Sequence, residues 1–302
     1  MESRGLDVSI IIVNYNTLKI TAECIDSVVE KTTGLDYEII LVDNASTDGS
    51  KEHFEKDARV RYFYQDENLG FGRANNYGLK YAQGRNILFL NPDTILVNNA
   101  VKMLSAYLDE NPEVGACGGN LYDAQMMPAM SFKRIYPGIG DEINNFFFHV
   151  PEKLIYRNSW YFNHSGTPIE VAYISGADLM IRRSILQEHG AFSPEFFMYY
   201  EETDLCLRIR RAGFRLVSVP QAQIQHLEGK SFQAGVNTRR LSISEQSRQV
   251  FYRRNYSKTY GAVANCIYSC SLLFHQLVYA MLRKPTKAET CRFIRKNLYK
   301  AQ

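Results

Sequence analysis

Polar side chains stand at the ends of three apolar runs in the first third of this chain. Short, continuous apolar runs of this kind are typical of strands that are buried on both faces. Ligands of open α/β sheets bind at the carboxyl edge of such strands. The sequence therefore predicts that the three polar tips meet around one polar ligand. The tips and the runs before them are Asn14-Tyr15-Asn16 after 8–13, Asp43 after 38–42, and Asn91-Pro92-Asp93 after 86–90.

A second acidic group precedes a predicted helix further along the chain. Glu201 and Glu202 are adjacent, and Asp204 lies two residues on. Two carboxylates that ionise in one pocket repel each other, which raises the pKa of one and improves it as a general base. Asp204 can cap the helix or orient the pair. The alternative is that all three acids only complement the dipole of the helix.

Strands and helices alternate through the first 110 residues. Alternation at this spacing predicts an α/β fold with a mostly parallel, Rossmann-like sheet and helices on both faces. Right-handed crossovers then bring the connecting loops to one edge of the sheet. Thr17 is a candidate N-cap for the first helix. The expected strands are 8–13, 38–42, 60–64 and 86–90, and the expected helices are 17–31, 50–57, 73–83 and 98–110.

The regular pattern breaks after residue 115. Residues 120–170 are rich in aromatic residues and turns, and we interpret them as an insertion that folds over the sheet edge. Regular structure then returns. The expected later elements are strands at 170–174 and 179–182, a helix that begins near 184, and a helix at 203–212 that Gly213 ends.

Charge is divided unevenly between the body and the tail of the chain. The net charge of +3 combines −8 over residues 1–226 with +11 over residues 227–302. A basic segment after an acidic body predicts a polyanionic partner, either a membrane surface or a nucleic acid. Because the chain has no known nucleic-acid-binding motif, we expect an anionic membrane surface and no nucleic acid.

An apolar stretch, 262–282, lies between clusters of Lys and Arg in the tail. It is long enough to span a membrane, but Asn265, Ser269 and Gln276 make a span costly. On a helix these polar residues lie opposite an apolar stripe. We expect a helix in the membrane interface, with a docking helix or a homodimer contact as the alternative. The stripe is Val263, Ile267, Cys270, Phe274, Leu277 and Met281.

The six cysteines are scattered and have no metal-binding spacing. This usage is typical of reduced proteins of the cytoplasm. The polar start of the chain, 1–7, has no signal-peptide pattern. We therefore expect a cytoplasmic protein that is held peripherally at the inner face of the cell membrane.

Seven short motifs, in one order over residues 8–231, give the chain a resemblance to the inverting glycosyltransferases of family 2, which have the GT-A fold. Each motif is weak alone, and the common order makes the signal strong. The Asn-Pro-Asp tip is similar to a variant of Asp-x-Asp in rhamnosyltransferase-like members. The motifs are Ile12–Asn16, Val42–Ser50, Asn68–Asn76, Leu90–Asp93, Ser175–Ala177, Phe196–Cys206 and His226-x-x-Gly229-x-Ser231.

The resemblance implies a nucleotide-sugar donor that binds to the first half of a domain at 1–231, over residues 1–115. A carboxylate and amides at strand tips can hold the imide of a base. Glycine backbone N–H groups suit a phosphate. The implied nucleotide-binding residues are Asn14, Tyr15, Asn16, Asp43, Asn68, Gly70 and Asn76.

The resemblance also implies a divalent cation, Mg2+ or Mn2+, that neutralises the leaving diphosphate. Asp93 is the candidate ligand. His226 is a second candidate, and an imidazole ligand somewhat favours Mn2+.

The half at 116–231 is expected to bind the acceptor and to carry the general base. Family members usually have Glu-Asp where this chain has Glu201-Glu202, and the second carboxylate is their base. The longer side chain leaves the choice between the two open, with Glu202 preferred and Asp204 beside them. Small residues leave room for a sugar at the acceptor site, and these are Ser175, Gly176 and Ala177.

We therefore expect an inverting, metal-dependent glycosyltransferase that uses dTDP-rhamnose or a UDP-hexose. Its acceptor would be a glycan or lipid-linked saccharide of a bacterial surface polysaccharide, and the tail at 232–302 would bind the membrane surface. A catalytically inactive sugar-nucleotide-binding or scaffold protein on the same fold is the alternative. A dinucleotide-dependent oxidoreductase is disfavoured, because Gly70-x-Gly72 lacks a third glycine at the required spacing and does not follow the first strand.

Overall fold

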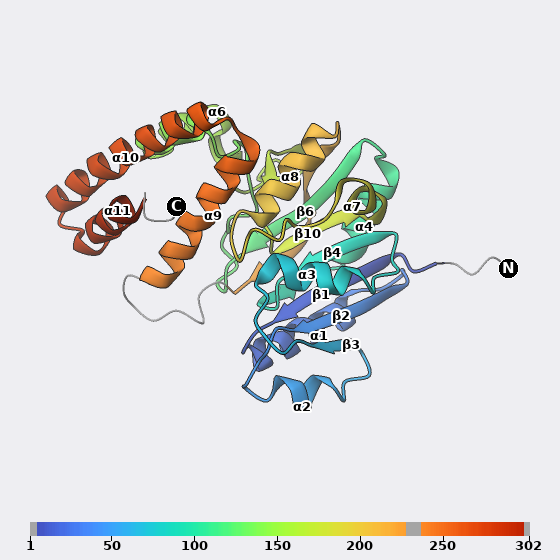
Figure 1. Cartoon of the computed structure of the whole chain (residues 1–302). Helices are drawn as coiled ribbons and strands as arrows, with labels where there is room; N and C mark the ends of the chain where they lie inside the picture. Colours follow the sequence, from blue (N-terminus) through green and yellow to red (C-terminus); the bar gives the residue numbers. More distant parts are fainter. Residues whose placement is uncertain (1–4, 228–236, 299–302) are drawn as a thin grey trace.

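The computed structural model describes residues 5–227 and 237–298 (Figure 1). A large sheet with its helices forms one end of the molecule, and helices from the end of the chain form the other (Figure 1). Gly229 and Ser231, the last part of the motif that begins at His226, lie outside the described residues. The domain boundary predicted at 231 also lies there.

The main sheet has nine strands in the described residues, eight of them in the order β3-β2-β1-β4-β10-β6-β11-β5, with β8 paired to β11. The first four of these are parallel. Strand β10 runs antiparallel between β4 and β6, and β6 and β11 are parallel again. The predicted α/β class is confirmed. The bounds are β1 Val8–Asn14, β2 Tyr37–Asp43, β3 Arg61–Tyr64, β4 Asn86–Leu90, β5 Thr94–Leu96, β6 Val114–Tyr122, β8 Ile169–Glu170, β10 Asp178–Arg182 and β11 Arg215–His226.

Helices cover both faces of the sheet. Successive side chains of a strand point to opposite faces, so Ile10 and Ile12 of β1 pack with α1 and α4 while Ile11 packs with α3, α7 and α8. Both faces are buried, which is why β1 and β4 read as unbroken apolar runs. The bounds are α1 Leu18–Lys31, α2 Ser50–Phe54, α3 Phe71–Leu79, α4 Ala100–Glu110, α7 Arg183–His189 and α8 Glu201–Arg211.

Strands β6 and β11 were not predicted from the sequence. Three glycines interrupt the apolar pattern of β6, and Pro220 interrupts that of β11. The glycines are needed for close packing, because a Cβ atom on Gly119 would lie 2.5 Å from the carbonyl oxygen of Ala222 on the neighbouring strand. A residue that reads as a breaker therefore marks a close backbone approach in this sheet.

The predicted insertion does not fold over the sheet edge along its whole length. Strand β7, within it, pairs with β9, which follows its end. Its middle forms two helices, α5 and α6, and α5 packs against the tail helix α10 instead. Apolar and aromatic side chains on both elements explain this packing. The bounds are β7 Phe132–Lys133, α5 Ile139–Phe146, α6 Val150–Tyr156, a 3-10 turn at Arg157–Ser159, and β9 Tyr173–Ile174.

The tail forms three helices, and the first of them belongs to the body of the protein. Phe251 and Tyr252 of α9 are buried in one apolar cluster with Phe196 and with Leu207 of α8. Helix α9 thus packs beside the helix that begins with the predicted catalytic acids. The bounds are α9 Thr238–Asn255, α10 Lys258–Met281 and α11 Pro285–Asn297.

A buried ion pair joins the insertion to the tail. The guanidinium of Arg248 on α9 donates to Glu142 on α5 at 2.6 Å and to Asn265 on α10 at 2.7 Å. Arg248 is 4% exposed and Glu142 is 5% exposed. The hydroxyl of Tyr252 also donates to Glu142, at 2.8 Å. One guanidinium therefore fixes three helices relative to one another.

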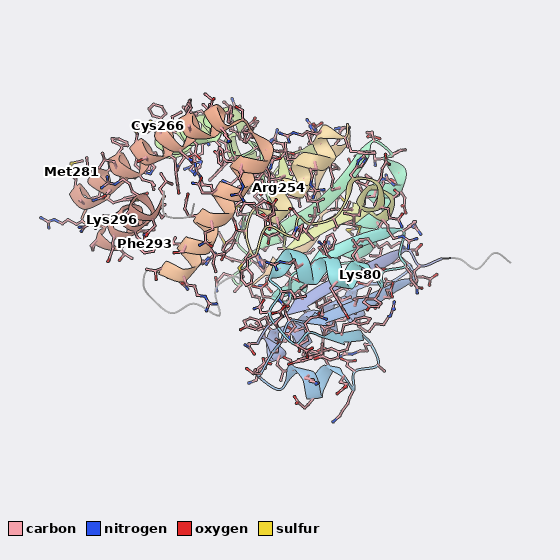
Figure 2. All side chains as sticks on the ribbon, in the orientation of Figure 1. Lys80, Arg254, Cys266, Met281, Phe293 and Lys296 are labelled. Carbon is pink, nitrogen blue, oxygen red and sulfur yellow. The ribbon has the colours of Figure 1, made fainter. Side chains whose placement is uncertain are left out.

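Helix α10 presents its apolar side to the outside. By length and composition it is apolar enough to cross a membrane, yet its polar side chains are the ones that touch the protein. Asn265 accepts from Arg248, Ser271 is buried beside Asn145, and His275 bonds the carbonyl of Phe146. Cys266 and Met281 lie at the outer rim of the molecule (Figure 2). The predicted stripe is real, and most of it is exposed.

We expect the Arg248→Ala variant to lose about 3–5 kcal/mol of its free energy of unfolding, because Glu142 would stay buried without its cation. Arg239 is exposed on the same helix, and the matched Arg239→Ala control should change stability by less than about 0.5 kcal/mol. Urea unfolding followed by circular dichroism measures both. Equal losses in the two variants would contradict a stabilising role for the buried pair.

Candidate active site

The tips of β1 and β2 form a buried floor at the sheet edge. The Asn14 amide donates to Asp43 at 3.4 Å and to Ser46 at 3.0 Å. Its carbonyl oxygen accepts from the hydroxyls of Thr17 at 2.8 Å and Thr21 at 2.9 Å. Thr17 precedes α1 but makes no side-chain cap there, because its hydroxyl bonds Asn14. The polar side-chain atoms of Asn14 are therefore all hydrogen-bonded within this floor.

Asp43 differs from the expectation that it contacts the nucleotide. Its carboxylate accepts from the backbone N–H of Ser46 at 2.8 Å and from the hydroxyl of Tyr62 at 2.9 Å. The residue is 0% exposed. Neighbouring side chains cover it, so in this structure Asp43 holds the loop after β2 and has no surface for a ligand.

Tyr15 and Asn16 are the exposed residues of the first tip. Asn16 has a left-handed backbone with φ of 54°. Its side-chain oxygen accepts from the backbone N–H of Thr47 at 2.7 Å, which ties the β1 loop to the β2 loop. Asn tolerates this conformation better than most residues. The turn leaves the Tyr15 ring, 48% exposed, at the rim.

The loop before α3 joins the two halves of the site. Gly70 has φ of 81°, and a Cβ atom there would lie 2.3 Å from the carbonyl oxygen of Phe197. That same oxygen accepts from the backbone N–H of Phe71 at 3.0 Å. Asn68 accepts from Asn44 at 2.8 Å. Glycine is therefore required at position 70, where the predicted nucleotide side meets the predicted acceptor side.

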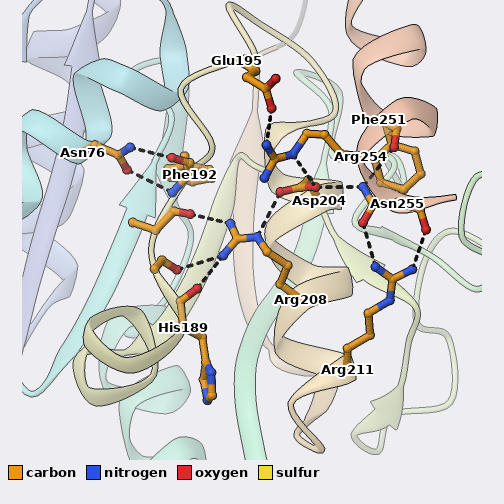
Figure 3. Close-up of polar contacts among 12 residues, drawn as sticks. Asn76, His189, Phe192, Glu195, Asp204, Arg208, Arg211, Phe251, Arg254 and Asn255 are labelled. Atoms are coloured by element: carbon orange, nitrogen blue, oxygen red, sulfur yellow. Dashed lines mark hydrogen bonds and ion pairs between the residues drawn. The ribbon is translucent and has the colours of Figure 1, made fainter.

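The side chain of Asn76 bonds to the protein itself. Its amide donates to the carbonyl of Phe192 at 2.7 Å, and its oxygen accepts from the backbone N–H of Phe192 at 3.0 Å (Figure 3). Both ends of the side chain bond one distant backbone unit. Asn76 therefore anchors the segment before α8 to α3, and its predicted contact with the nucleotide stays a prediction.

Asp93 and His226 meet as predicted. Strand β5 pairs with β11 so that Thr94 lies opposite His226, and Asp93 Oδ1 lies 3.2 Å from His226 Nε2. Asn91 lies 3.4 Å from the same nitrogen. Asp93 keeps 30% of its side chain exposed. A carboxylate and an imidazole at adjacent strand ends thus form a pair in which Asp93 is partly exposed and His226 is buried.

This pair fits a divalent cation that takes its other ligands from a substrate. Carboxylate oxygen and imidazole nitrogen are both common metal donors. Within the described residues, no group of three or more His, Cys, Asp and Glu side chains could hold a metal alone. Hard cations bound by one or two protein groups complete their shell with phosphate oxygens and water.

Residues 175–177 connect the metal pair to the acidic pair. The backbone N–H of Asn91 donates to the carbonyl of Ala177 at 2.9 Å. A Cβ atom on Gly176 would lie 3.6 Å from Cγ of Glu202 and 3.7 Å from the ring of Phe71. Residues 175–177 therefore contact both the segment that carries Asp93 and the side chain of Glu202. The convergence of these residues on one ligand stays a prediction.

Glu201 and Glu202 begin α8 in different surroundings. Glu201 is 3% exposed, and burial together with the nearby Glu202 charge raises its pKa to about 8. Within the described residues, its Oε2 is buried without a hydrogen-bond partner. Glu202 is partly exposed, and burial also raises its pKa. A pKa near 8 favours the protonated form of Glu201 at neutral pH, and Glu202 is the more exposed of the two carboxylates.

Two strained residues set the start of α8. Tyr199 and Tyr200 have φ of 71° and 69°, a region that is unfavourable for bulky side chains. Helix α9 holds them in place. The Ser247 hydroxyl donates to the carbonyl of Met198 at 2.7 Å, and the ring of Phe251 packs against Tyr200 at 5.7 Å.

Asp204 ties α8 to α9 (Figure 3). It is 1% exposed. Its carboxylate accepts from Arg208 at 3.0 Å and from the Asn255 amide at 2.9 Å, with Arg254 at 3.5 Å. Arg208 also donates to the carbonyl of His189 at 2.8 Å. The two roles considered were capping of the helix and orientation of the acidic pair, and the bonds to the side chains of Arg208 and Asn255 fit orientation better than capping.

Sequence reasoning missed the residues that position the acids. Asn255 lies 51 residues beyond Asp204, and no local pattern links them. The role of Asn44 was overlooked because the residue belongs to a turn motif. Its side chain bonds both Asn68 and the backbone N–H of Leu69. The polar side chains that flank the catalytic motifs were the only available signal.

A model of the family described as glycosyl transferase family 2 matches residues 9–190. An N-acetylglucosaminyl-diphospho-decaprenol L-rhamnosyltransferase of Mycobacterium tuberculosis is 28% identical over 213 residues, which are 64% of this chain and 67% of that protein. The low-salt glycan biosynthesis hexosyltransferase Agl10 of Haloferax volcanii is 24% identical over 228 residues, 72% of this chain and 65% of its own. The O-antigen biosynthesis protein RfbC of Myxococcus xanthus is 27% identical over 75% of this chain, but this covers only 18% of that protein.

Two solved structures share the fold. The mannosyltransferase PcManGT of Pyrobaculum calidifontis, in complex with GDP-Man and Mn2+, superimposes with a TM-score of 0.61 at 15% identity. The match covers 100% of this chain and 89% of that one. GalNAc-T7 with UDP, GalNAc and Mn2+ has a TM-score of 0.62 at 14% identity, over 99% of this chain and 57% of the other. These likenesses establish the GT-A architecture of the present chain.

We expect the stability of the Glu201→Gln variant, relative to that of the original protein, to increase as the pH rises. The buried acid has a pKa near 8, against an ordinary value of 4.5, so the folded protein keeps a proton that the unfolded chain loses. As the pH rises from the ordinary pKa to the raised one, the free energy of unfolding of the original protein therefore falls by on the order of 1 kcal/mol per pH unit. The Gln variant lacks this loss.

Thermal unfolding of both proteins at about pH 5 and about pH 8 measures the difference. Glu110→Gln, at an exposed position on α4, is the control and should follow the original protein. Parallel pH dependence in all three proteins would contradict a protonated Glu201.

Proposed function

The chain belongs to glycosyl transferase family 2, and from that premise we propose that it moves a sugar from a nucleoside diphosphate to a hydroxyl of a glycan or lipid-linked saccharide. The observation that carries the proposal is the arrangement around Gly176. Glu202 adjoins Gly176, with its Cγ 3.6 Å from the place of a Cβ atom there. The next residue, Ala177, accepts through its carbonyl from the backbone N–H of Asn91, two residues before Asp93, which pairs with His226. A leaving diphosphate would need the Asp93–His226 pair, and an attacking hydroxyl would need Glu202.

The donor nucleotide would lie along the ends of β1 and β2. Tyr15 offers an exposed ring and Asn16 an exposed amide there. Gly70, with its neighbour Asn68, would present backbone N–H groups toward the diphosphate, a role that favours residues without a side chain. Asp43 and Asn14 would act one layer below, as the groups that hold these loops.

Asp93 and His226 would hold Mg2+ or Mn2+. When bound, such a cation neutralises the charge that develops on the leaving diphosphate. The Mn2+ in both structural neighbours supports a divalent cation. With its imidazole as a ligand, His226 would favour Mn2+ over Mg2+.

Glu202 would act as the general base. Its carboxylate takes the proton of the acceptor hydroxyl while the oxygen forms a bond to the anomeric carbon. The bond from that carbon to the diphosphate breaks, and its electron pair leaves with the nucleoside diphosphate. One displacement inverts the anomeric configuration. Glu201 keeps its own proton at neutral pH and so adds no second charge.

The name of the mycobacterial relative supports a rhamnosyl donor and a lipid diphosphate acceptor. We propose dTDP-rhamnose or a UDP-hexose as the donor, and a lipid-linked saccharide of a surface polysaccharide as the acceptor. Such an acceptor places the protein at the inner face of the cell membrane, bound peripherally through its basic tail. A homodimer through the same tail is the competing arrangement.

We expect Glu202→Gln to lower the transfer rate by about 10²–10⁴-fold, because the amide cannot accept the proton. The affinity for nucleoside diphosphate in the presence of Mn2+ should stay unchanged. Transfer assays and calorimetry with UDP, dTDP and GDP measure the two quantities. Loss of nucleotide binding together with transfer would remove Glu202 from the role of base.

We expect Asp93→Ala to weaken Mn2+-dependent nucleotide binding by about tenfold or more, which corresponds to about 1.4 kcal/mol. Binding without metal should be unaffected. The exposed Glu110→Ala variant on α4 is the control for loss of a surface carboxylate. Metal dependence that persists unchanged in the Asp93 variant would exclude it as a ligand.

A further inference from the structure

An apolar surface without charged residues runs along the outer side of α10. It carries exposed side chains at helical spacing from Val263 to Leu282. Soluble proteins rarely expose contiguous apolar patches of this extent without a partner. Its largest members are Val263 at 44% exposure, Leu273 at 43%, Phe274 at 40%, Leu277 at 55%, Met281 at 75% and Leu282 at 57%.

The hairpin of α5 and α6, from the insertion, exposes a second apolar group. Leu154 is 73% exposed and Ile155 is 69% exposed, higher values than for most residues of α10. Phe147 is 54% and Val150 is 49% exposed. These side chains belong to a part of the chain more than 100 residues before the start of α10.

The two apolar groups are one surface. The rings of Phe146 and Phe274 stack with centroids 5.1 Å apart. Phe147, Val150 and Leu154 of the hairpin and Phe274 of the tail line a common hollow of about 560 Å³. We use the name apolar platform for this surface, which consists of the exposed apolar residues of α6, of α10 and of the loop that joins α5 to α6.

We propose that the apolar platform docks on an anionic lipid bilayer and that the α5–α6 hairpin, not the tail alone, enters the interface. The inference rests on the proposed function, which places the acceptor at a membrane. The proposed function places the membrane contact in the basic tail alone, and the hairpin adds a second contact segment. The hollow gives space for a hydrocarbon chain.

The polar side of α10 argues against a span. Arg248 holds Asn265 at 2.7 Å, and the His275 ring bonds the Phe146 carbonyl at 3.2 Å. Ser271 is fully buried against α5. Insertion of the helix across a bilayer would break these bonds in a medium that offers no replacement. A helix whose polar side is occupied by protein and whose apolar side is bare lies in the interface.

Charge favours lipid over a second copy of the chain. Arg283, Lys284 and Lys287 are exposed just beyond α10, and Lys258 lies at its start. Helix α10 contains no Asp or Glu. In a two-fold dimer through this helix the cations of one copy would face those of the other, whether the helices ran parallel or antiparallel. Anionic head groups complement the same cations.

The test measures vesicle binding of the full chain and of hairpin variants. Leu154→Glu and Ile155→Glu should each weaken binding to phosphatidylglycerol vesicles by about tenfold or more. Val29→Glu, at a position on α1 with 40% exposure, is the matched control and should bind like the original protein. Unfolding temperatures of all variants check that they fold. Binding of the hairpin variants equal to that of the control would overturn the proposal.

Cysteine protection gives an independent readout. Cys266 and Cys270 are exposed on the platform, while Cys24, Cys117, Cys206 and Cys291 are buried. Vesicles should slow maleimide labelling of the exposed pair. Labelling of bound protein at the full rate would contradict docking through α10, and protection by dimerisation in the absence of lipid would identify a second copy instead.

The outcome is separable from the proposed function. Transfer to a water-soluble acceptor should persist in the hairpin variants, because Leu154 and Ile155 are exposed side chains that the proposed mechanism does not use. Transfer without vesicle binding in the original protein would refute the platform and leave the enzyme intact. Vesicle binding without transfer to any acceptor would do the reverse.

Discussion

One buried carboxylate, Asp204, holds the acidic pair in its position. It lies on α8 and accepts from Arg208 of its own helix and from Asn255 of α9. Arg208 in turn grips the backbone around His189, and Arg254 pairs with Glu195 (Figure 3). This network fixes one side of the helix that begins with Glu201 and Glu202. Helix α9 of the tail is therefore packed into the same body as α8.

The same network explains how a strained start of α8 persists. Two tyrosines in left-handed conformation cost on the order of 1–3 kcal/mol each unless the surroundings enforce them. Ser247 and Phe251 of α9 supply that enforcement. The strain turns the chain so that consecutive acids point into different environments. Burial raises the pKa of both acids and favours the protonated form of Glu201.

The sequence was informative where function depends on backbone geometry and misleading where it depends on side-chain direction. The strand ends at Asn14, Asp43 and Asp93 were predictable because both faces of those strands are buried. The direction of each polar tip was not, since Asp43 and Asn76 have the right residue types but bond to the protein itself. Contacts such as Asp204 with Asn255 depend on packing between distant helices, which no local pattern contains.

Helix α10 shows why composition alone could not place the tail. Length and hydropathy describe a membrane span, a core helix and an interfacial helix in the same terms. The arrangement of its few polar residues separates them, because Asn265, Ser271 and His275 all bond to the protein. Those bonds fix which side is left bare. Helices α9 and α10 are joined by only Tyr256 and Ser257. The exposed apolar side of α10 is therefore closely linked to α9, whose Asn255 bonds Asp204 of α8.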